Sequence, residues 1–544
     1  MSEPNVMYDH FYTYAELASW LAALQAAQPA LVSVASLATT AEGRSVHVVT
    51  VTDPATGPAA DKPAYFVQAG LHAQEGAGTT AACHFLYRLL TDPACAPLLR
   101  KLAFYVVPRI NPDGTEFALT KRTRVRSRFE QTETKNGLQP ADLNGDGLIL
   151  SMRWEDPAGP MVVDPEEPRL MVRRQPGDAG PFYQVTTEGL VHDYDGGPIV
   201  DGTRLIDFNR NWPTHWETGH NGSRYPFAEP EVRAVGEFLL AHPNIFAGVD
   251  FHCGTHAIFK PCTVAESTLP PADLELMVRV GKRAEQLTGF PLMHQGLDYK
   301  EPWRPPHQLH GIATDWTYQA LGLSQYLIEL GNGFNNAGIS PREYFAADAR
   351  EREGAMMRRV LAFHDRQGSR LFVPWTACDH PQLGPVEVGG ILNGCGYWMW
   401  PPVMAEIAPR TTAFLLEHAG LHPELTIVKA VATALGGGVF RVRATVANVG
   451  GFSTRVMEGG GSEAQLPPVR VRLAPGDGVR VVSRQTTLEV GHLAAGGGSA
   501  ACEWFVVADA APGRGTVTLE ARHPRGGVAR TALALDPTAL REGD

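Results

Sequence analysis

The chain has 544 residues, which is enough for two or three domains of ordinary size. Hydrophobic residues make up 44% of it and charged residues 19%, a balance that excludes a chain disordered throughout. Its 47 basic and 58 acidic side chains give a net charge of −11, which disfavours nucleic acids and anionic membranes as partners.

The N-terminal segment lacks the features of an export signal. Its first basic residue is Arg44, so the positively charged start of a secretory leader is missing. No run of 18 apolar residues occurs along the sequence, which therefore predicts no membrane-spanning helix. We expect a cytoplasmic protein that does not bind membranes.

Strand and helix patterns alternate over residues 1–384. Apolar runs such as Ala64–Gln68 and Phe104–Val107 alternate along the chain with helical patterns such as Thr79–Leu90 and Glu231–Ala241. This alternation predicts an α/β domain in which helices flank a mixed sheet.

A segment at about 130–200 interrupts that alternation and is rich in Asp, Gly and Pro, which predicts an insertion. It contains Asp142–Gly147, whose D-x-N-x-D-G pattern opens a calcium loop. The twelfth position of such a loop is Arg153 and not Glu, and Asp193–Gly196 is a second partial match. Acidic turns held by side-chain hydrogen bonds are the favoured interpretation, with a structural Ca²⁺ as the alternative.

The pattern changes after residue 384. Residues 385–424 are predicted to link the first domain to a second over 425–544, where short period-2 segments predict an antiparallel β-sandwich. The 14 acidic and 14 basic side chains after residue 384 cancel, so the net charge of −11 belongs to the first domain. The period-2 segments are Phe440–Ala447, Val469–Leu473, Val479–Ser483, Trp504–Val507 and Thr516–Ala521.

Metal-ligating residue types occur at strand ends. The seven cysteines include no C-x-x-C pair, so a metal site would use His and carboxylates. His72 and Glu75 form an H-x-x-E pair directly after a predicted strand, and His252 ends the strand-like run Phe246–Phe251. Two His and one Glu would leave a zinc ion one open position. A solvent-exposed helix start and a buried neutral histidine are the alternatives.

A carboxylate also interrupts the apolar run Tyr326–Leu330. Glu329 lies among Leu and Ile residues, where burial would raise the pKa of its carboxyl and suit it to base chemistry. A structural glutamate with a buried partner is the alternative.

Six motifs, in order, give residues 60–335 a strong resemblance to the zinc carboxypeptidase family of metallopeptidases. They are His72-x-x-Glu75, Asn111-Pro112-Asp113-Gly114, Asp207-Phe208-Asn209-Arg210-Asn211-Trp212, Glu229-Pro230-Glu231, His252, and Asp315-Trp316-Thr317-Tyr318 followed by Glu329. Large members of the family are similar in carrying a C-terminal β domain.

The resemblance implies that His72, Glu75 and His252 hold one Zn²⁺ ion per chain. Asp207 would orient a ligand imidazole from behind. Glu329 would be the general base that takes a proton from zinc-activated water and passes it to the leaving amine.

The resemblance also implies an arginine that stabilises the tetrahedral oxyanion. Its distance from Asn111–Gly114 favours Arg126, while Arg122, Arg124 and Arg128 in the same segment remain alternatives.

Substrate contacts follow the family pattern in part. Asn209 and Arg210 would hold a terminal carboxylate, which suits the two-pronged guanidinium. His307 stands where many members have a capping tyrosine, so either it replaces that contact, or Tyr299 supplies it, or the contact is missing. Thr314, at the expected pocket floor, is neither acidic nor large and apolar, which leaves the side-chain preference open.

These residues predict a metallocarboxypeptidase acting on a peptide, or a related amide, with a free carboxylate. An amidase or deacylase acting on a cell-wall peptide or an N-acyl amino acid is one alternative. A non-catalytic binding protein on the same fold is another, although it would be expected to lack a ligand or the base. The oligomeric state stays open.

Overall fold

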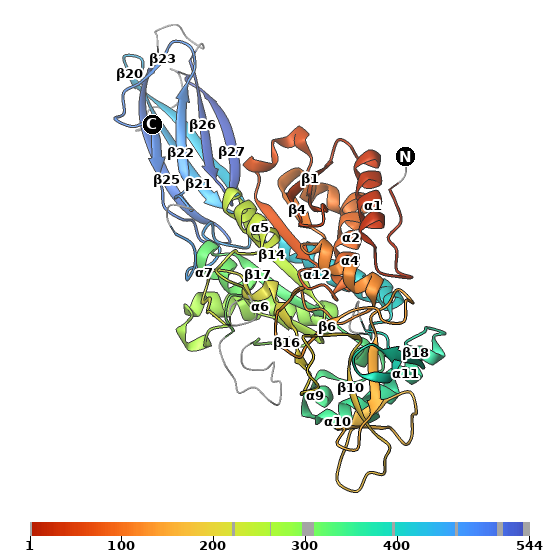
Figure 1. The fold of residues 1–544 in the computed structure, drawn as a ribbon. Coiled ribbons are helices and arrows are strands. Elements are labelled where there is room, and N and C mark those ends of the chain that lie inside the picture. The colour runs from red at the N-terminus through yellow and green to blue at the C-terminus, as the bar shows by residue number, and fades with distance from the viewer. Residues whose placement is uncertain are drawn as a thin grey trace.

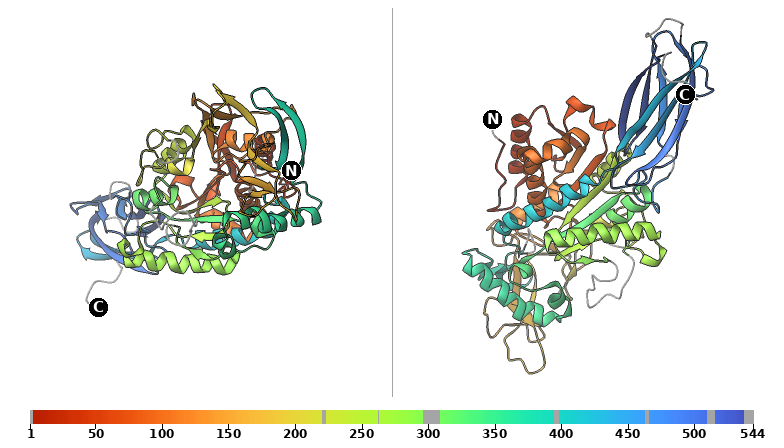
Figure 2. Two further views of the ribbon diagram at one scale, coloured as in Figure 1. Left: turned by 60° about the horizontal axis from the view of Figure 1, so that its bottom comes forward. Right: turned by 180° about the vertical axis from the view of Figure 1, so that it is seen from behind.

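The computed structural model describes residues 3–219, 223–261, 263–295, 309–393, 398–462, 466–508 and 515–536. A central α/β domain lies between two appended parts at its opposite ends (Figures 1 and 2). One is a lobe built from residues 132–202 and 333–392, and the other is a C-terminal β-sandwich.

The central domain contains an eight-stranded mixed sheet. Strands β4, β3, β14 and β17 at its middle run parallel, so their carboxyl ends meet at one edge. In sheet order the strands are β1 (Val32–Thr39), β2 (Ser45–Val51), β4 (Ala103–Val107), β3 (Ala64–Ala69), β14 (Ile245–His252), β17 (Ser324–Leu330), β15 (His256–Phe259) and β16 (Leu292–Met293). The predicted mixed sheet is confirmed.

Helices cover both faces of this sheet because alternate residues of its buried strands point to opposite sides. Tyr65 and Val67 of β3 belong to the core under α2 (Gly76–Thr91), α6 (Pro271–Thr288) and α12 (Met404–Gly420). Phe66 lies in a second core under α5 (Pro230–Ala241) and α7 (Ala313–Leu321). The domain also contains α1 (Tyr14–Ala27), α3 (Ala96–Lys101) and α4 (Pro112–Lys121).

The lobe combines the predicted insertion with a segment more than 130 residues later. Strands β7 and β19 pair across this gap, and both segments share one apolar core. Its six-stranded sheet has the order β18 (Phe372–His380), β19 (Gly384–Ile391), β7 (Ser151–Glu155), β10 (Phe182–Thr187), β8 (Met161–Val163) and β9 (Met171–Arg173). The later segment adds α8 (Gly333–Asn336), α9 (Pro341–Ala346), α10 (Ala349–Glu351) and α11 (Met357–Arg366).

Short strand pairs connect the insertion to the central domain. They are β5 (Arg128–Gln131) with β13 (Thr203–Ile206), and β6 (Gly137–Pro140) with β11 (Gly189–His192) and β12 (Val200–Asp201).

The described part of residues 385–424, for which the sequence predicted a linker, contains ordered elements of both neighbouring parts. Strand β19 belongs to the lobe, and α12 packs against α2 and α6 of the central domain. Helix α12 is held there because Leu415 and Phe414 are buried in the core of that domain.

The β-sandwich predicted for the C-terminal region is confirmed. Its two antiparallel sheets enclose a core around Trp504, Val442 and Leu519. One sheet contains β20 (Leu425–Gly436), β21 (Val439–Asn448), β25 (Gly498–Ala508) and β23 (Val479–Val481), and the other β24 (Thr487–Glu489), β22 (Arg470–Pro475), β26 (Thr516–His523) and β27 (Gly527–Ala534). In the described residues, no helix has the length and apolarity needed to cross a bilayer.

Candidate metal centre and active site

Two predicted metal ligands lie where β3 ends and α2 begins. His72 is in the connection after the strand, and Glu75 is the residue immediately before the helix. Their side chains are 1% and 2% exposed, and His72 Nδ1 lies 2.8 Å from Glu75 Oε1. The strand end and the helix start therefore aim both groups at one point.

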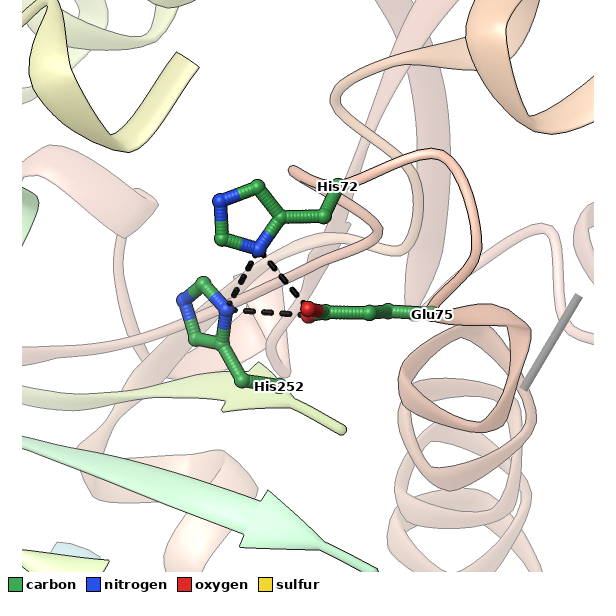
Figure 3. Close-up of side chains that lie close together, drawn as sticks. All are labelled: His72, Glu75 and His252. Atoms are coloured by element: carbon green, nitrogen blue, oxygen red, sulfur yellow. Dashed lines mark hydrogen bonds and ion pairs between the residues drawn. The ribbon is translucent and has the colours of Figure 1, made fainter. Parts of the chain in front are cut away.

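His252, the last residue of β14, brings a third ligand to the same point (Figure 3). Its Nδ1 lies 2.9 Å from Glu75 Oε2 and 3.1 Å from His72 Nδ1. Among the described residues this is the one group of three His, Cys, Asp or Glu side chains with ligand atoms within 4.8 Å of one another.

Each imidazole is held from behind by a carboxylate. His72 Nε2 lies 3.0 Å from Asp207 Oδ1, and His252 Nε2 lies 3.1 Å from Asp250 Oδ2. These contacts at Nε2 leave the Nδ1 atoms of both rings facing the carboxylate of Glu75. Two imidazole nitrogens and a carboxylate within about 3 Å of one another are a donor set that zinc accepts, so the residues fit a metal ion.

Asp250 was missed by the sequence analysis. It lies two residues before His252 on a strand, so both side chains point to the same face of the sheet. This spacing was a usable signal, because a carboxylate at that position can only turn toward the imidazole or remain buried without compensation.

Electrostatics in the site favour positive charge. Burial opposes ionisation of Glu75, yet His72 and His252 hold the pKa of its carboxyl below the ordinary value. Burial alone would lower the pKa of His252, but Asp250 and Glu75 raise it above the ordinary value. Likewise Arg126 and His72 keep the pKa of Asp207 well below its usual range despite burial.

Glu329 faces the same centre from β17. It pairs in register with His252 on the neighbouring parallel strand, so both side chains lie on one face. Burial, followed by repulsion from Glu75, raises the pKa of Glu329 to about 8. Its Oε2 atom has no hydrogen-bond partner within the described part of the chain, which leaves it free to take up a proton.

Arg126 is the member of the predicted arginine group that reaches the centre. Its Nε lies 3.1 Å from Asp207 Oδ2 and its Nη1 lies 3.3 Å from Glu75 Oε1. Arg128 instead pairs with Glu229, at 2.6 Å. The side chain of Arg126 is 35% exposed, so it contacts both the buried carboxylates and solvent.

The turn at Asn111–Gly114 holds this arginine segment in place. Asn111 Nδ2 donates to Ser127 O at 2.7 Å, and Arg126 O accepts from Ala73 N at 2.8 Å. A Cβ atom at Gly114 would lie 2.1 Å from Ser127 O, so the approach requires glycine.

Three of the predicted substrate-binding residues, Asn209, Arg210 and Thr314, lie at the start of α7. Asn209 Oδ1 accepts a hydrogen bond from Ala313 N at 2.9 Å, and Arg210 Nη1 donates to Asn209 O at 2.7 Å. Thr314 is 1% exposed, and its hydroxyl has no hydrogen-bond partner among the described residues. His307 and Tyr299 lie outside the described residues.

The acidic turn at Asp142–Gly147 is closed by its own side chains. Asp142 accepts hydrogen bonds from Gly145 N and Gly147 N, both at 2.8 Å, and Asp146 accepts one from Leu148 N. These contacts are the Asx hydrogen bonds favoured over calcium binding.

The zinc carboxypeptidase family matches residues 17–353, more than half of the chain, and this range contains the whole centre. The chain belongs to the zinc carboxypeptidase family. A second match, to a domain of unknown function, covers residues 424–534, where the sandwich lies.

Several characterised carboxypeptidases are similar in sequence. Carboxypeptidase A2 of Rattus norvegicus is 32% identical over 327 residues, 58% of this chain and 61% of that protein. Carboxypeptidase A6 of Mus musculus is 25% identical over 291 residues, 50% of this chain and 49% of that protein. Each match spans less than two thirds of the relative.

Solved structures also align with the chain. Thrombin-activatable fibrinolysis inhibitor is 15% identical, with a TM-score of 0.43, over 76% of this chain and 74% of its own. Carboxypeptidase A of Helicoverpa armigera is 18% identical, with a TM-score of 0.40, over 66% of this chain and 74% of its own.

Proposed function

We propose that the protein is a zinc-dependent carboxypeptidase that hydrolyses the C-terminal peptide bond of its substrate. The observation that carries this proposal is the convergence of His72, His252 and Glu75 on one point, with Glu329 in register on the next strand. A binding protein on this fold would not need to keep both the ligands and a buried base.

His72 and His252 would hold zinc through Nδ1 and Glu75 through its carboxylate, which leaves an open position. Zinc bound there would supply Lewis acidity toward the scissile carbonyl and toward water. Asp207 and Asp250 would fix the tautomer and orientation of the two imidazoles.

Glu329 is proposed as the general base. Its carboxylate would accept a proton from the attacking water and then give it to the nitrogen of the leaving amine. The raised pKa of about 8 suits this exchange, because a group that titrates near neutral pH can both take and release a proton. A cation held by Glu75 would oppose part of that rise.

Arginines are proposed to recognise the charges of the substrate. Arg126 reaches the centre from a partly exposed position and would stabilise the oxyanion as it develops. Arg210, with Asn209 beside it, would bind the terminal carboxylate through paired hydrogen bonds. Such contacts restrict the substrate to a peptide or amide that ends in a free carboxylate.

The test compares wild-type protein with Glu329→Gln on peptides and N-acyl amino acids. Loss of the base is expected to lower kcat by about 10²–10⁴-fold, with zinc content unchanged. Glu406→Gln, at a side chain that is 74% exposed on α12, is the matched control and should keep full activity.

Two results would contradict the proposal. Protein purified without chelator that contains no stoichiometric zinc is not a zinc enzyme. Equal cleavage of free and C-terminally amidated peptides would remove Arg210 from the assigned role. Cleavage of N-acyl amino acids alone would favour the amidase or deacylase alternative.

A further inference from the structure

Helix α7 connects the proposed substrate pocket to the β-sandwich. At its N-terminal end, Ala313 N donates to Asn209 Oδ1 at 2.9 Å, and Thr314, the residue expected at the floor of that pocket, follows. The inference below rests on the proposed function, since it gives these two residues contact with substrate. The helix has nine residues, so a shift at one end moves the other.

A buried arginine of the sandwich caps the C-terminal end of this helix. Arg525 lies in the turn between β26 and β27 and is 2% exposed. Its Nη1 donates to Gly322 O at 3.1 Å and to Arg455 O at 2.9 Å, and its Nη2 donates to Leu321 O. The guanidinium therefore meets the carbonyls that α7 cannot satisfy itself, at the negative end of the helix dipole.

A sandwich loop holds the side of the same helix. Tyr318 Oη donates to Asp273 Oδ2 at 2.8 Å, and Asp273 also accepts from Glu458 N and Gly459 N at 2.7 and 2.8 Å. A Cβ atom at Gly460 would lie 1.8 Å from Tyr318 O. The loop thus lies directly against the backbone of α7.

The buried contact of Arg525 with α7 differs from the exposed contact that the sandwich also makes with the central domain. Burial, with repulsion from Arg455, lowers the pKa of Arg525 to about 9, which shows how unfavourable the position is for a cation. Arg522 docks the same sandwich on Asp61 through an exposed ion pair at 2.6 Å. A buried guanidinium aimed at a helix end adds geometric precision that an exposed pair does not.

We propose that the sandwich positions α7, with Arg525 as the positioning residue, so that Asn209 and Thr314 are held in place to receive the C-terminal residue of the substrate.

The test replaces Arg525 and separates binding from chemistry. Arg525→Met is expected to raise KM for N-acylated dipeptides on the order of tenfold, with kcat and zinc content within about twofold of wild type. Arg525→Lys should recover part of the loss, because an ammonium can donate to the same carbonyls. Arg522→Gln, which breaks the exposed contact, should leave KM unchanged.

Amide hydrogen exchange gives a second readout that needs no activity. Residues 313–321 are expected to exchange faster in Arg525→Met and at the wild-type rate in Arg522→Gln. If Arg525→Met does not fold, Tyr318→Phe, which removes the hydroxyl bound to Asp273, should show the same changes at smaller size.

The outcomes are distinguishable. Unchanged KM and unchanged exchange in an active Arg525→Met protein overturn the positioning role. If zinc-loaded wild type cleaves no substrate, the proposed function fails, and exchange at 313–321 still decides whether the sandwich holds α7.

Discussion

At the metal centre the two imidazole-bound carboxylates have different surroundings. Asp207 binds His72 and also receives Arg126, whereas Asp250 has His252 as its ionic partner. Within the described chain, neither oxygen of Asp250 accepts a hydrogen bond, so its 3.1 Å contact with His252 is ionic. The two carboxylates therefore act alike on the ligands but not on the proposed oxyanion site.

We predict that Asp250→Asn lowers zinc affinity by about 10–100-fold, because the charge that orients His252 is lost. Asp207→Asn should lower affinity to a similar extent and also lower kcat, since Arg126 loses one of the two carboxylates that hold it. Chelator competition measures the first effect and kinetics at saturating zinc the second. Equal affinity in wild type and Asp250→Asn would show that His252 is oriented without the carboxylate.

The proposed ligands and Glu329 could be predicted from the sequence because each lies at a strand end or in an apolar run. A polar side chain is unfavourable there unless it has a partner or a function. Asp250 was not predicted, because its neighbours Val249 and Phe251 indicated only a buried strand. The contact between Arg126 and Asp207 joins residues 81 positions apart in the sequence. A local sequence pattern does not predict a contact over that separation.

Among the helices, α12 differs most from expectation. The sequence predicted a linker at residues 385–424, but 17 of these residues form a helix that covers the central sheet. His418 explains the fit: its Nδ1 lies 3.0 Å from Tyr65 Oη and its Nε2 lies 3.1 Å from Ser324 Oγ. These partners belong to strands that are far from α12 in the sequence, so the residues of the helix alone did not predict that it packs on the central sheet.

The same histidine predicts a loss of stability in acid. Burial lowers the pKa of His418 to about 3, against roughly 6.5 in the unfolded chain. The unfolded state therefore binds the proton first, and stability is lost as the pH falls from 6.5 toward 3. This group contributes about 2 kcal/mol of that loss between pH 7 and pH 5.

Denaturant unfolding of wild type and His418→Gln at both pH values measures this effect. The variant is expected to be less stable at pH 7 but to lose about 2 kcal/mol less on acidification. An identical loss in both proteins would mean that His418 does not titrate on unfolding.

For the molecule as a whole, the change of pattern after residue 384 predicted two domains, and the charge count placed the acidic excess in the first. It did not predict the lobe, because the insertion is covered by residues 333–392, whose helical patterns looked like part of the α/β domain. Leu150 and Met152 pack with Val360 and Leu361 in one core, and only the folded chain brings these pairs together.

We therefore predict that the insertion cannot be removed alone. Deleting residues 132–202 should expose the apolar faces of α11 and β19, so that the protein binds a hydrophobic dye or precipitates. Arg169→Gln, which breaks an exposed ion pair with Asp365 between the two segments, should remain soluble. A monomeric deletion protein with the wild-type melting temperature would contradict the shared core.

Helix α12 has a further consequence during synthesis. Tyr65, Phe246 and Tyr326 form the sheet face that α12 covers, and all three are synthesised before residue 330. Helix α12, which covers these side chains, is complete only about 90 residues later. Synthesis of that length at roughly 5–20 residues per second takes on the order of 5–20 s. Throughout that interval the nascent chain carries an open aromatic surface, so the growing protein depends on slow aggregation, or on a chaperone, until its own helix arrives.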